Sequence, residues 1–394
     1  MFRAVAFTVL ALFSSFAFAQ DSNQMADSGS GSASTVQVVY VINGSTLTTY
    51  NVNPKTLQAT SVGKLTLPES IYPGLVTSPT GEFLYYIAFE NINQQDEKLY
   101  VYQTDASGVP GSKPVQTLTA TGLGGIVIDP KGNFLYTEVA GAQSSETTTY
   151  TINRYVMNPS TGKLSDPVVE AKYKLDSYEG GEFCGLGIIG VNSAGTELYD
   201  GISCTYPQGG ASATYNERSI DASTGALGPD VQIYSWNNDG NQSGQNVYFV
   251  KNFLFDFVSN NGGSDENLVN IYPIQANVTK PTISCGTSMY APCGDFISAR
   301  AHPSAEYVFL TDPTSVTDIG KVNLSTKKIV ETSSIPYEVQ EFSPDGTIAY
   351  GVNDVNGALD IEIYGFSVAT GDVTRGGTIS VPSDLDSWWA AERY

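Results

Sequence analysis

Residues 343–353 have the sequence SPDGTIAYGVN, and variants of this stretch recur along nearly the whole chain of 394 residues. The proline fixes φ at the start of a tight turn, and Gly346 supplies a positive φ three residues before the apolar-aromatic pair Ala349-Tyr350. The strand that follows alternates until it reaches a polar loop. The stretch therefore predicts one half of a β-hairpin.

The apolar-aromatic pair occurs seven times, and successive copies are 41 to 63 residues apart. This spacing suits about four short strands per unit. After each pair a second strand runs into another turn, always in the same order. The repeat predicts an all-β fold, a seven-bladed β-propeller of four-stranded antiparallel blades. The pairs are Val39-Tyr40, Leu84-Tyr85, Leu135-Tyr136, Leu198-Tyr199, Leu254-Phe255, Val308-Phe309 and Ala349-Tyr350.

The first copy lacks the turn that stands before the others. A propeller closes well when one blade is shared between the two ends of the chain. We therefore expect the C-terminal residues 387–393 to form the innermost strand of the first blade.

The segment Tyr40-Val41-Ile42-Asn43 and the turns of the Ser-Pro-Asp-Gly type give the chain a family resemblance. Residues 36–394 resemble the bacterial YVTN and lactonase-like seven-bladed propeller family. Such turns are structural, so the motif is specific for the fold and says little about activity. Some relatives are lactonases or lactone-forming enzymes that use His, Arg and Glu on the channel face. The resemblance therefore permits an enzyme, although we match none of those catalytic residues in this chain.

The N-terminus has the pattern of an export signal. Arg3 precedes an uncharged apolar run, and Ala17-Phe18-Ala19 has the small-x-small form of a cleavage site. We expect residues 1–19 to be a signal peptide, residues 20–35 a flexible leader, and residues 36–394 the propeller. No stretch reaches the roughly 18 to 20 apolar residues that a membrane helix needs. The sequence thus predicts a secreted or periplasmic monomer without membrane insertion.

The chain is strongly acidic, with 40 Asp and Glu against 19 Lys and Arg and a net charge of −21. Cleaving the signal removes Arg3 and no acidic residue, which shifts the charge from −21 to −22. A polyanion would meet a repulsive field, so nucleic acid and phosphorylated sugars are disfavoured as partners. This argues against the 6-phosphogluconolactonase activity of some family members. Cations and basic partners are favoured, although the acidity also serves simply to keep a secreted β-protein soluble.

Four cysteines in an exported chain suggest two disulfides. If one hairpin turns at residues 193–195, residues whose numbers sum to 388 face each other, which places Cys184 opposite Cys204. Cys285 and Cys293 then close a short loop. A metal-thiolate site is the alternative, but the cysteine spacings suit zinc poorly.

Propeller geometry sorts the loops between two faces. With strands A to D counted outward from the channel, the repeated turn joins A to B on the lower face, and the B–C and D–A loops share the upper face. The B–C loops are long, polar and acidic, so we expect function on the upper face. They span residues 90–97, 141–148, 205–214, 259–267, 312–318 and 353–358.

The residues at which the inner strands begin are candidates for a ligand site. Three of the inner strands begin with an uncharged residue, namely Tyr72, Gly124 and Gln245. The other inner strands begin with charged residues. Convergent carboxylates can bind Ca²⁺ or act as acid and base, or they can merely hydrogen-bond water in the channel. Ca²⁺ is the one cofactor that they suggest. The predicted ligand-binding residues are Glu182, Asp295, Arg300, Glu338, Asp384 and Asp386.

The single histidine, His302, occupies the turn position of Ser343, where we expect a structural role on the lower face. No nucleophile elbow, zinc-protease motif or phosphate loop occurs in the sequence. The first functional hypothesis is therefore an exported binding or scaffold propeller with an acidic upper face, whose partner is an unknown protein or small molecule. The alternative is a lactonase-like hydrolase that acts on a small lactone at the channel mouth.

Overall fold

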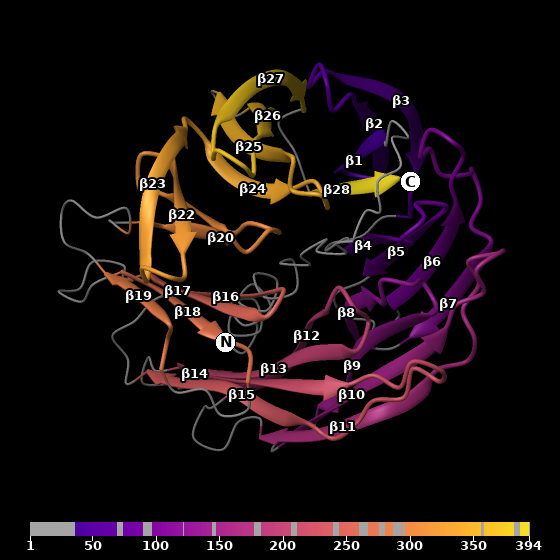
Figure 1. Cartoon of the computed structure of the whole chain (residues 1–394). Coiled ribbons are helices and arrows are strands. Elements are labelled where there is room, and N and C mark those ends of the chain that lie inside the picture. Colours follow the sequence, from indigo (N-terminus) through magenta and orange to yellow (C-terminus); the bar gives the residue numbers. More distant parts are fainter. Residues whose placement is uncertain are drawn as a thin grey trace, which may run out of the picture. The chain divides into compact units, whose positions relative to one another are not determined.

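The computed structural model describes residues 36–68, 74–89, 97–120, 122–143, 147–176, 183–205, 211–238, 244–259, 267–275, 280–286, 293, 296–355, 358–381 and 387–393. These residues form 28 strands and no helix, in seven four-stranded antiparallel sheets. The fold is a seven-bladed β-propeller, as predicted (Figure 1). The described part of the chain accordingly contains no helix of the length and apolar character needed to span a membrane.

The chain divides into two compact units, and the first of them holds three blades. In each of these three blades the strands pair in chain order, and the first strand is the innermost (Figure 1). The blades comprise β4 (Gly74–Thr77), β5 (Phe83–Phe89), β6 (Glu97–Gln103) and β7 (Gln116–Ala120); β8 (Leu123–Ile128), β9 (Phe134–Gln143), β10 (Thr147–Val156) and β11 (Val168–Asp176); and β12 (Phe183–Val191), β13 (Glu197–Thr205), β14 (Ala211–Ser219) and β15 (Val231–Asn238).

The second unit holds the other four blades, together with the turn Asp105–Val109. Its blades comprise β1 (Val36–Asn43), β2 (Thr46–Val52), β3 (Ala59–Thr66) and β28 (Ser387–Arg393); β16 (Gly244–Val250), β17 (Phe253–Ser259), β18 (Leu268–Pro273) and β19 (Ile283–Gly286); β20 (Ser298–Ala301), β21 (Tyr307–Thr311), β22 (Thr317–Asn323) and β23 (Lys328–Ile335); and β24 (Glu338–Phe342), β25 (Ile348–Val355), β26 (Ala358–Phe366) and β27 (Val373–Ser380).

Strand β28 completes the blade of β1, β2 and β3, and this confirms the predicted closure. It pairs antiparallel with β1, from Ile42 opposite Ser387 to Val36 opposite Arg393. The two ends of the chain therefore share one sheet, and β1 becomes the second strand of its blade. All seven apolar-aromatic pairs lie on that second strand, because the repeat is one blade long.

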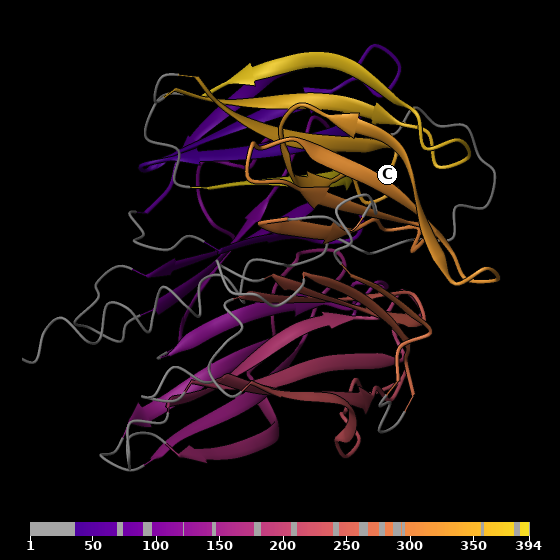
Figure 2. The same cartoon turned by 90° about the vertical axis from the view of Figure 1, so that its left-hand side faces the viewer.

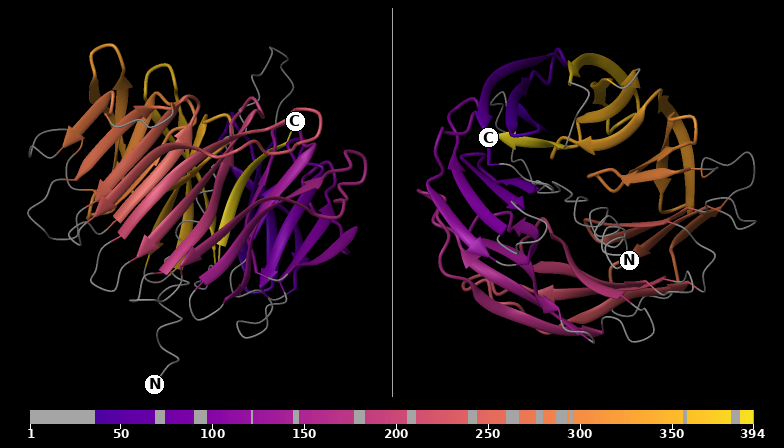
Figure 3. Two further views of the ribbon diagram at one scale, coloured as in Figure 1. Left: turned by 90° about the horizontal axis from the view of Figure 1, so that it is seen from below. Right: turned by 180° about the vertical axis from the view of Figure 1, so that it is seen from behind.

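The core lies between neighbouring blades. In the first unit, one apolar cluster joins β8–β11 to β12–β15, the magenta and pink sheets that lie side by side in Figure 3. In the second unit, another cluster joins the orange β20–β23 sheet to the yellow β24–β27 sheet (Figure 2). Each sheet thus buries both faces, which explains why inward and outward positions of the second strands are apolar.

The tyrosine of the repeated pair also ties one blade to the next. In three of the pairs the tyrosine hydroxyl donates a hydrogen bond to the carbonyl of a glycine in the next outer turn along the chain, and each of these glycines has a positive φ. The bonds run from Tyr40 to Gly108 at 2.7 Å, from Tyr85 to Gly162 at 2.9 Å and from Tyr136 to Gly225 at 2.8 Å. These three tyrosines are buried in the core, and the hydroxyl adds a directional contact to their packing.

Both disulfides are present as predicted, Cys184 with Cys204 and Cys285 with Cys293. The register behind the first needs one correction. Near the turn of that hairpin, the numbers of two facing residues add up to 389, as they do for Val191 and Leu198. Ile189 is an extra residue that forms a bulge at the next position. Beyond the bulge the sum becomes 388, which brings the two cysteines opposite each other.

Three B–C loops are clearly shorter than predicted, and one of them is the loop expected over residues 205–214, because β13 continues to Thr205 and β14 begins at Ala211. Strand β9 continues to Gln143 and β10 begins at Thr147, although we expected a loop over residues 141–148. In the last blade β25 continues to Val355 and β26 begins at Ala358, although we expected a loop from residue 353. Polar residues in these segments extend the antiparallel ladder, since backbone pairing does not require apolar side chains.

Candidate functional site

Only part of the predicted ligand site lies within the described residues. Glu182, Asp295, Asp384 and Asp386 lie outside the described residues. Arg300 and Glu338 are described, on the inner strands β20 and β24 of the second unit. These two strands and β16 are the innermost strands of three consecutive blades in that unit.

Arg300 links all three inner strands. Its Nη1 donates to the hydroxyl of Tyr248 on β16 at 2.6 Å, and its Nε donates to the carbonyl of Gln340 on β24 at 3.3 Å. A further bond joins Nη1 to the carbonyl of Ala299 at 3.0 Å. The Tyr248 hydroxyl also donates to that carbonyl, at 3.1 Å. The guanidinium is thus fixed in place before any ligand arrives.

A β-bulge in β24 forms part of this arrangement. Val339 faces Gly351 and Glu341 faces Tyr350, so Gln340 is the extra residue, and its carbonyl is the one that Arg300 contacts. Bulges commonly re-aim side chains and backbone groups near sites. Here the bulge supplies an acceptor that regular strand pairing would use.

Two carboxylates act electrostatically on the same guanidinium. Burial alone would lower the pKa of Arg300, but Tyr248, Glu341 and Glu338 outweigh burial and raise it. The predicted residues Arg300 and Glu338 thus interact electrostatically, and Tyr248 and Glu341, which our sequence analysis did not include, act on the same guanidinium. We refer to Tyr248, Arg300, Glu338 and Glu341 as the arginine site.

His302 has the structural place that its turn position predicts. The ring is fully buried, and it hydrogen-bonds Ser304 through Nδ1 and the carbonyl of Gly346, in the next blade's turn, through Nε2, both at 2.8 Å. Burial lowers the pKa of His302 to about 4. The rings of Phe309, Phe342 and Phe366 surround it.

A second charged position, Glu138 on β9 of the first unit, was missed in the sequence analysis. Opposite Glu138 the inner strand β8 carries a bulge made of Gly124 and Gly125, because Leu123 faces Val139 and Ile126 faces Thr137. The carboxyl accepts hydrogen bonds from the backbone N–H groups of Gly125 and of Ile188, on the next blade's inner strand. The sequence could have indicated this position, because side chains alternate along a strand and Glu138 therefore lies on the same strand face as the buried Tyr136.

The first unit also contains a buried ion pair between Asp200 on β13 and Arg218 on β14. Arg218 Nε donates to Asp200 Oδ2 at 2.8 Å, and the two side chains are 6% and 0% exposed. Asn216 donates to the other carboxylate oxygen at 3.0 Å, and Tyr173 from the neighbouring blade contacts both partners. Asp200 and Arg218 pair with each other, and Tyr173 links this pair to the neighbouring blade, so the network serves to join blades.

Metal binding receives no support from the residues that can be placed. Within the described ranges, no group of three or more His, Cys, Asp or Glu side chains could hold a metal ion. The expected Ca²⁺ site remains a prediction, because Glu182, Asp295, Asp384 and Asp386 lie outside those ranges.

Comparison with known proteins places the fold. No family model matches the chain, and no curated protein matches it. The solved structures that it resembles include a 6-phosphogluconolactonase candidate from Bacteroides fragilis, at 12% identity over 92% of this chain and 99% of that one, with a TM-score of 0.57. A periplasmic gluconolactonase from Pseudomonas aeruginosa shares 10% identity over 90% of this chain and 99% of its own, with a TM-score of 0.54.

A protein from Lactobacillus plantarum is similar to a comparable extent, with 10% identity over 91% of this chain and 99% of that chain and a TM-score of 0.50. At this level of identity the likeness concerns the fold alone. The chain thus shares the propeller fold with these three proteins over 90% to 92% of its own length and 99% of theirs.

Proposed function

We propose that this chain is an exported β-propeller that binds a basic or cationic partner through acidic groups on its inner strands and loops, without chemistry of its own. The observation that supports this proposal most directly is the arginine site, where two glutamates act electrostatically on one fixed guanidinium. One positive charge against two negative charges leaves a net charge of −1. The excess of negative over positive side chains in this group would attract a ligand that carries a positive charge.

The charge of the whole chain favours the same class of partner. With a net charge of −21, the protein attracts cations from a distance and repels polyanions. Export is supported by the N-terminal signal pattern and by the two disulfides, which form in oxidising compartments.

A lactonase-like hydrolase is the second candidate, and the same site favours it. A fixed guanidinium can stabilise the negative charge that develops on a lactone carbonyl oxygen, and a nearby carboxylate can activate water. Arg300 together with Glu338 or Glu341 supplies both groups. Lactonases among the structures of similar fold make this chemistry worth testing.

One set of measurements separates the two candidates. The melting temperature is recorded with spermine or CaCl₂, and hydrolysis of glucono-1,5-lactone is followed by acid release. The binding proposal predicts a rise in melting temperature that Glu338→Lys abolishes, because a ligand that selects the folded state stabilises it. Turnover that is lost in Arg300→Gln would instead establish the hydrolase.

A control variant is available on an exposed surface. Glu306→Lys makes the same change of charge as Glu338→Lys, but on an exposed side chain of the second unit. This variant should keep the rise in melting temperature that spermine causes. An equal loss in both variants would mean that only overall charge attracts spermine, and this result would contradict a defined site.

A further inference from the structure

Glu138 lies where two neighbouring blades of the first unit meet. Its strand, β9, belongs to the β8–β11 blade, and the carboxyl also contacts β12 of the next blade. On the same face of β9, Tyr136 packs into the apolar cluster that joins these blades, with Leu186 and Ile188 from β12. A carboxyl group in this position is largely removed from water.

The inner strand is shaped to admit this carboxyl. A Cβ atom at Gly124 would lie 2.9 Å from Glu138 Oε1, closer than real contacts allow, and one at Gly125 would lie 3.7 Å from Oε2. Two adjacent glycines therefore leave the room that the carboxyl occupies. The bulge also frees the Gly125 N–H from strand pairing, so that it can donate to the carboxyl.

The groups facing Glu138 provide little charge compensation. β8 presents Gly124 and Gly125, and β12 presents the backbone of Ile188. From β10 the titratable neighbour is Tyr150, whose own pKa is raised to about 12 by burial and then by the Glu138 charge. No cation acts on Glu138 among the described residues; two backbone N–H groups oppose its burial, and burial prevails, raising its pKa to about 8.

We propose that Glu138 is a proton-binding site that controls how firmly the β8–β11 and β12–β15 blades hold together. In the protonated state a neutral acid fills the glycine bulge and accepts the N–H bond from Ile188 across the blade junction. In the ionised state a charge without a counter-ion must draw water into the junction. Part of Glu138 remains accessible, and this gives the proton a path to solvent.

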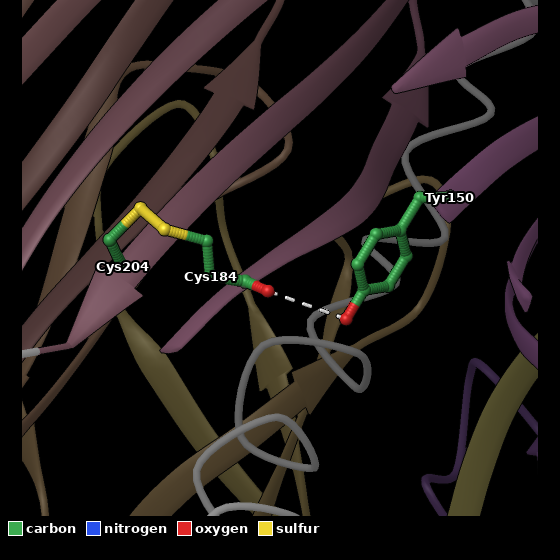
Figure 4. Close-up of a disulfide and its surroundings, with 3 residues drawn as sticks. All are labelled: Tyr150, Cys184 and Cys204. Atoms are coloured by element: carbon green, nitrogen blue, oxygen red, sulfur yellow. Dashed lines mark hydrogen bonds between the residues drawn. A yellow bond between two sulfur atoms is a disulfide. The ribbon is translucent and has the colours of Figure 1, made fainter. Parts of the chain in front are cut away.

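A second contact crosses the same junction beside this site. Figure 4 shows the Tyr150 ring from β10 pointing its hydroxyl at the carbonyl of Cys184 on β12, at 3.4 Å, and the Cys184–Cys204 disulfide on the other side of that residue. The disulfide ties β12 to β13, so opening of the junction would move the β12–β13 hairpin as one piece. None of these residues belongs to the arginine site, which lies in the second unit.

The direction of the pH effect follows from linkage. The folded-state pKa of about 8 lies above the ordinary value of 4.5, so the proton favours the folded form. This stabilisation is complete below pH 4.5 and is lost as the pH rises through about 8. Between those values, the unfolding constant of the parent should rise about tenfold per pH unit relative to a variant that cannot ionise.

The test compares the parent with Glu138→Gln, which mimics the neutral acid, in urea titrations from pH 5 to pH 9. The exposed Glu82→Gln in the same unit is the control and should keep the parent's pH dependence. If the free energy of unfolding changes with pH in the same way in the parent and in Glu138→Gln, the proposal is overturned. Hydrogen exchange of the Ile188 amide, corrected for the intrinsic rate, should lose protection above pH 8 only in the parent, and unchanged protection would refute the coupling between blades.

Two further measurements keep the proposal testable if Glu138→Gln does not fold. The carboxyl ¹³C resonance of Glu138 in the parent should titrate near pH 8, and titration near 4.5 would refute the proton site. Gly124→Ala should destabilise the parent because its methyl group displaces the carboxyl. In a Glu138→Ala background the same change should be nearly neutral, and an equal loss in both backgrounds would show that the glycine bulge serves another purpose.

Discussion

Replacing Arg218 by methionine should leave the Asp200 carboxylate buried without its counter-ion. Asp200 is fully buried and would keep only two neutral donors, the Asn216 amide at 3.0 Å and the Tyr173 hydroxyl at 3.2 Å. Breaking a buried pair by removing one partner typically lowers stability by about 3–5 kcal/mol. Arg218 is 6% exposed, so solvent cannot replace it, and we expect a loss in this range at pH 7.

The double variant Asp200→Asn with Arg218→Met provides the matched control. It removes both charges, so most of the loss should be recovered, with a coupling energy of about 2–3 kcal/mol. Burial already raises the pKa of Asp200, and losing Arg218 raises it further. The deficit of the single variant should therefore shrink as the pH falls and Asp200 takes up a proton.

Urea denaturation followed by tryptophan fluorescence and circular dichroism gives these free energies, provided that the two signals coincide. Hydrogen exchange in β13 and β14 assigns the loss to the correct blade. A loss below about 1 kcal/mol for Arg218→Met at pH 7 would refute the reasoning, because it would mean that water reaches Asp200.

Three further predictions concern the ties between and within blades. Tyr136→Phe removes the bond to Gly225 and should lower the free energy of unfolding by about 1 kcal/mol in urea titrations, and no change would contradict a net contribution from this bond. The β12–β13 disulfide spans 20 residues and the β19 disulfide 8, so removing the first should lower stability by about 0.8 kcal/mol more, measured in the same way. Deleting residues 387–394 should melt the whole second unit, since β1 loses its partner strand, and a melting temperature within a degree or two of the parent would count against closure.

The fold was predictable because its signal is repeated. The turn glycines Gly81, Gly132, Gly195 and Gly346 all have a positive φ, and Ala305 adopts the same conformation where the glycine is replaced. Seven copies of one pattern average out local exceptions, so blade number and strand order follow from the repeat, and closure follows from the turn that the first copy lacks. The disulfide pairing followed for the same reason.

The candidate sites were less predictable, because they depend on departures from the repeat. Arg300 was identified as a charged residue on an inner strand, but its partner carbonyl belongs to Gln340, the extra residue of a bulge. Nothing in the alternation of β24 marks that insertion. Tyr248 joined the site from the preceding blade, a contact that depends on how two sheets pack.

The bulges suggest a common physical origin for both charged positions. Regular inner strands commit their backbone groups to strand pairing, so a charged side chain buried beside them would find no partner. An extra residue releases one backbone group per bulge. In the second unit the released group is the Gln340 carbonyl, and it accepts from the cation Arg300. In the first unit it is the Gly125 N–H, and it donates to the carboxyl of Glu138. The sign of the buried charge thus matches the type of backbone group that each bulge exposes, which is the relation expected if the bulges exist to hold these side chains.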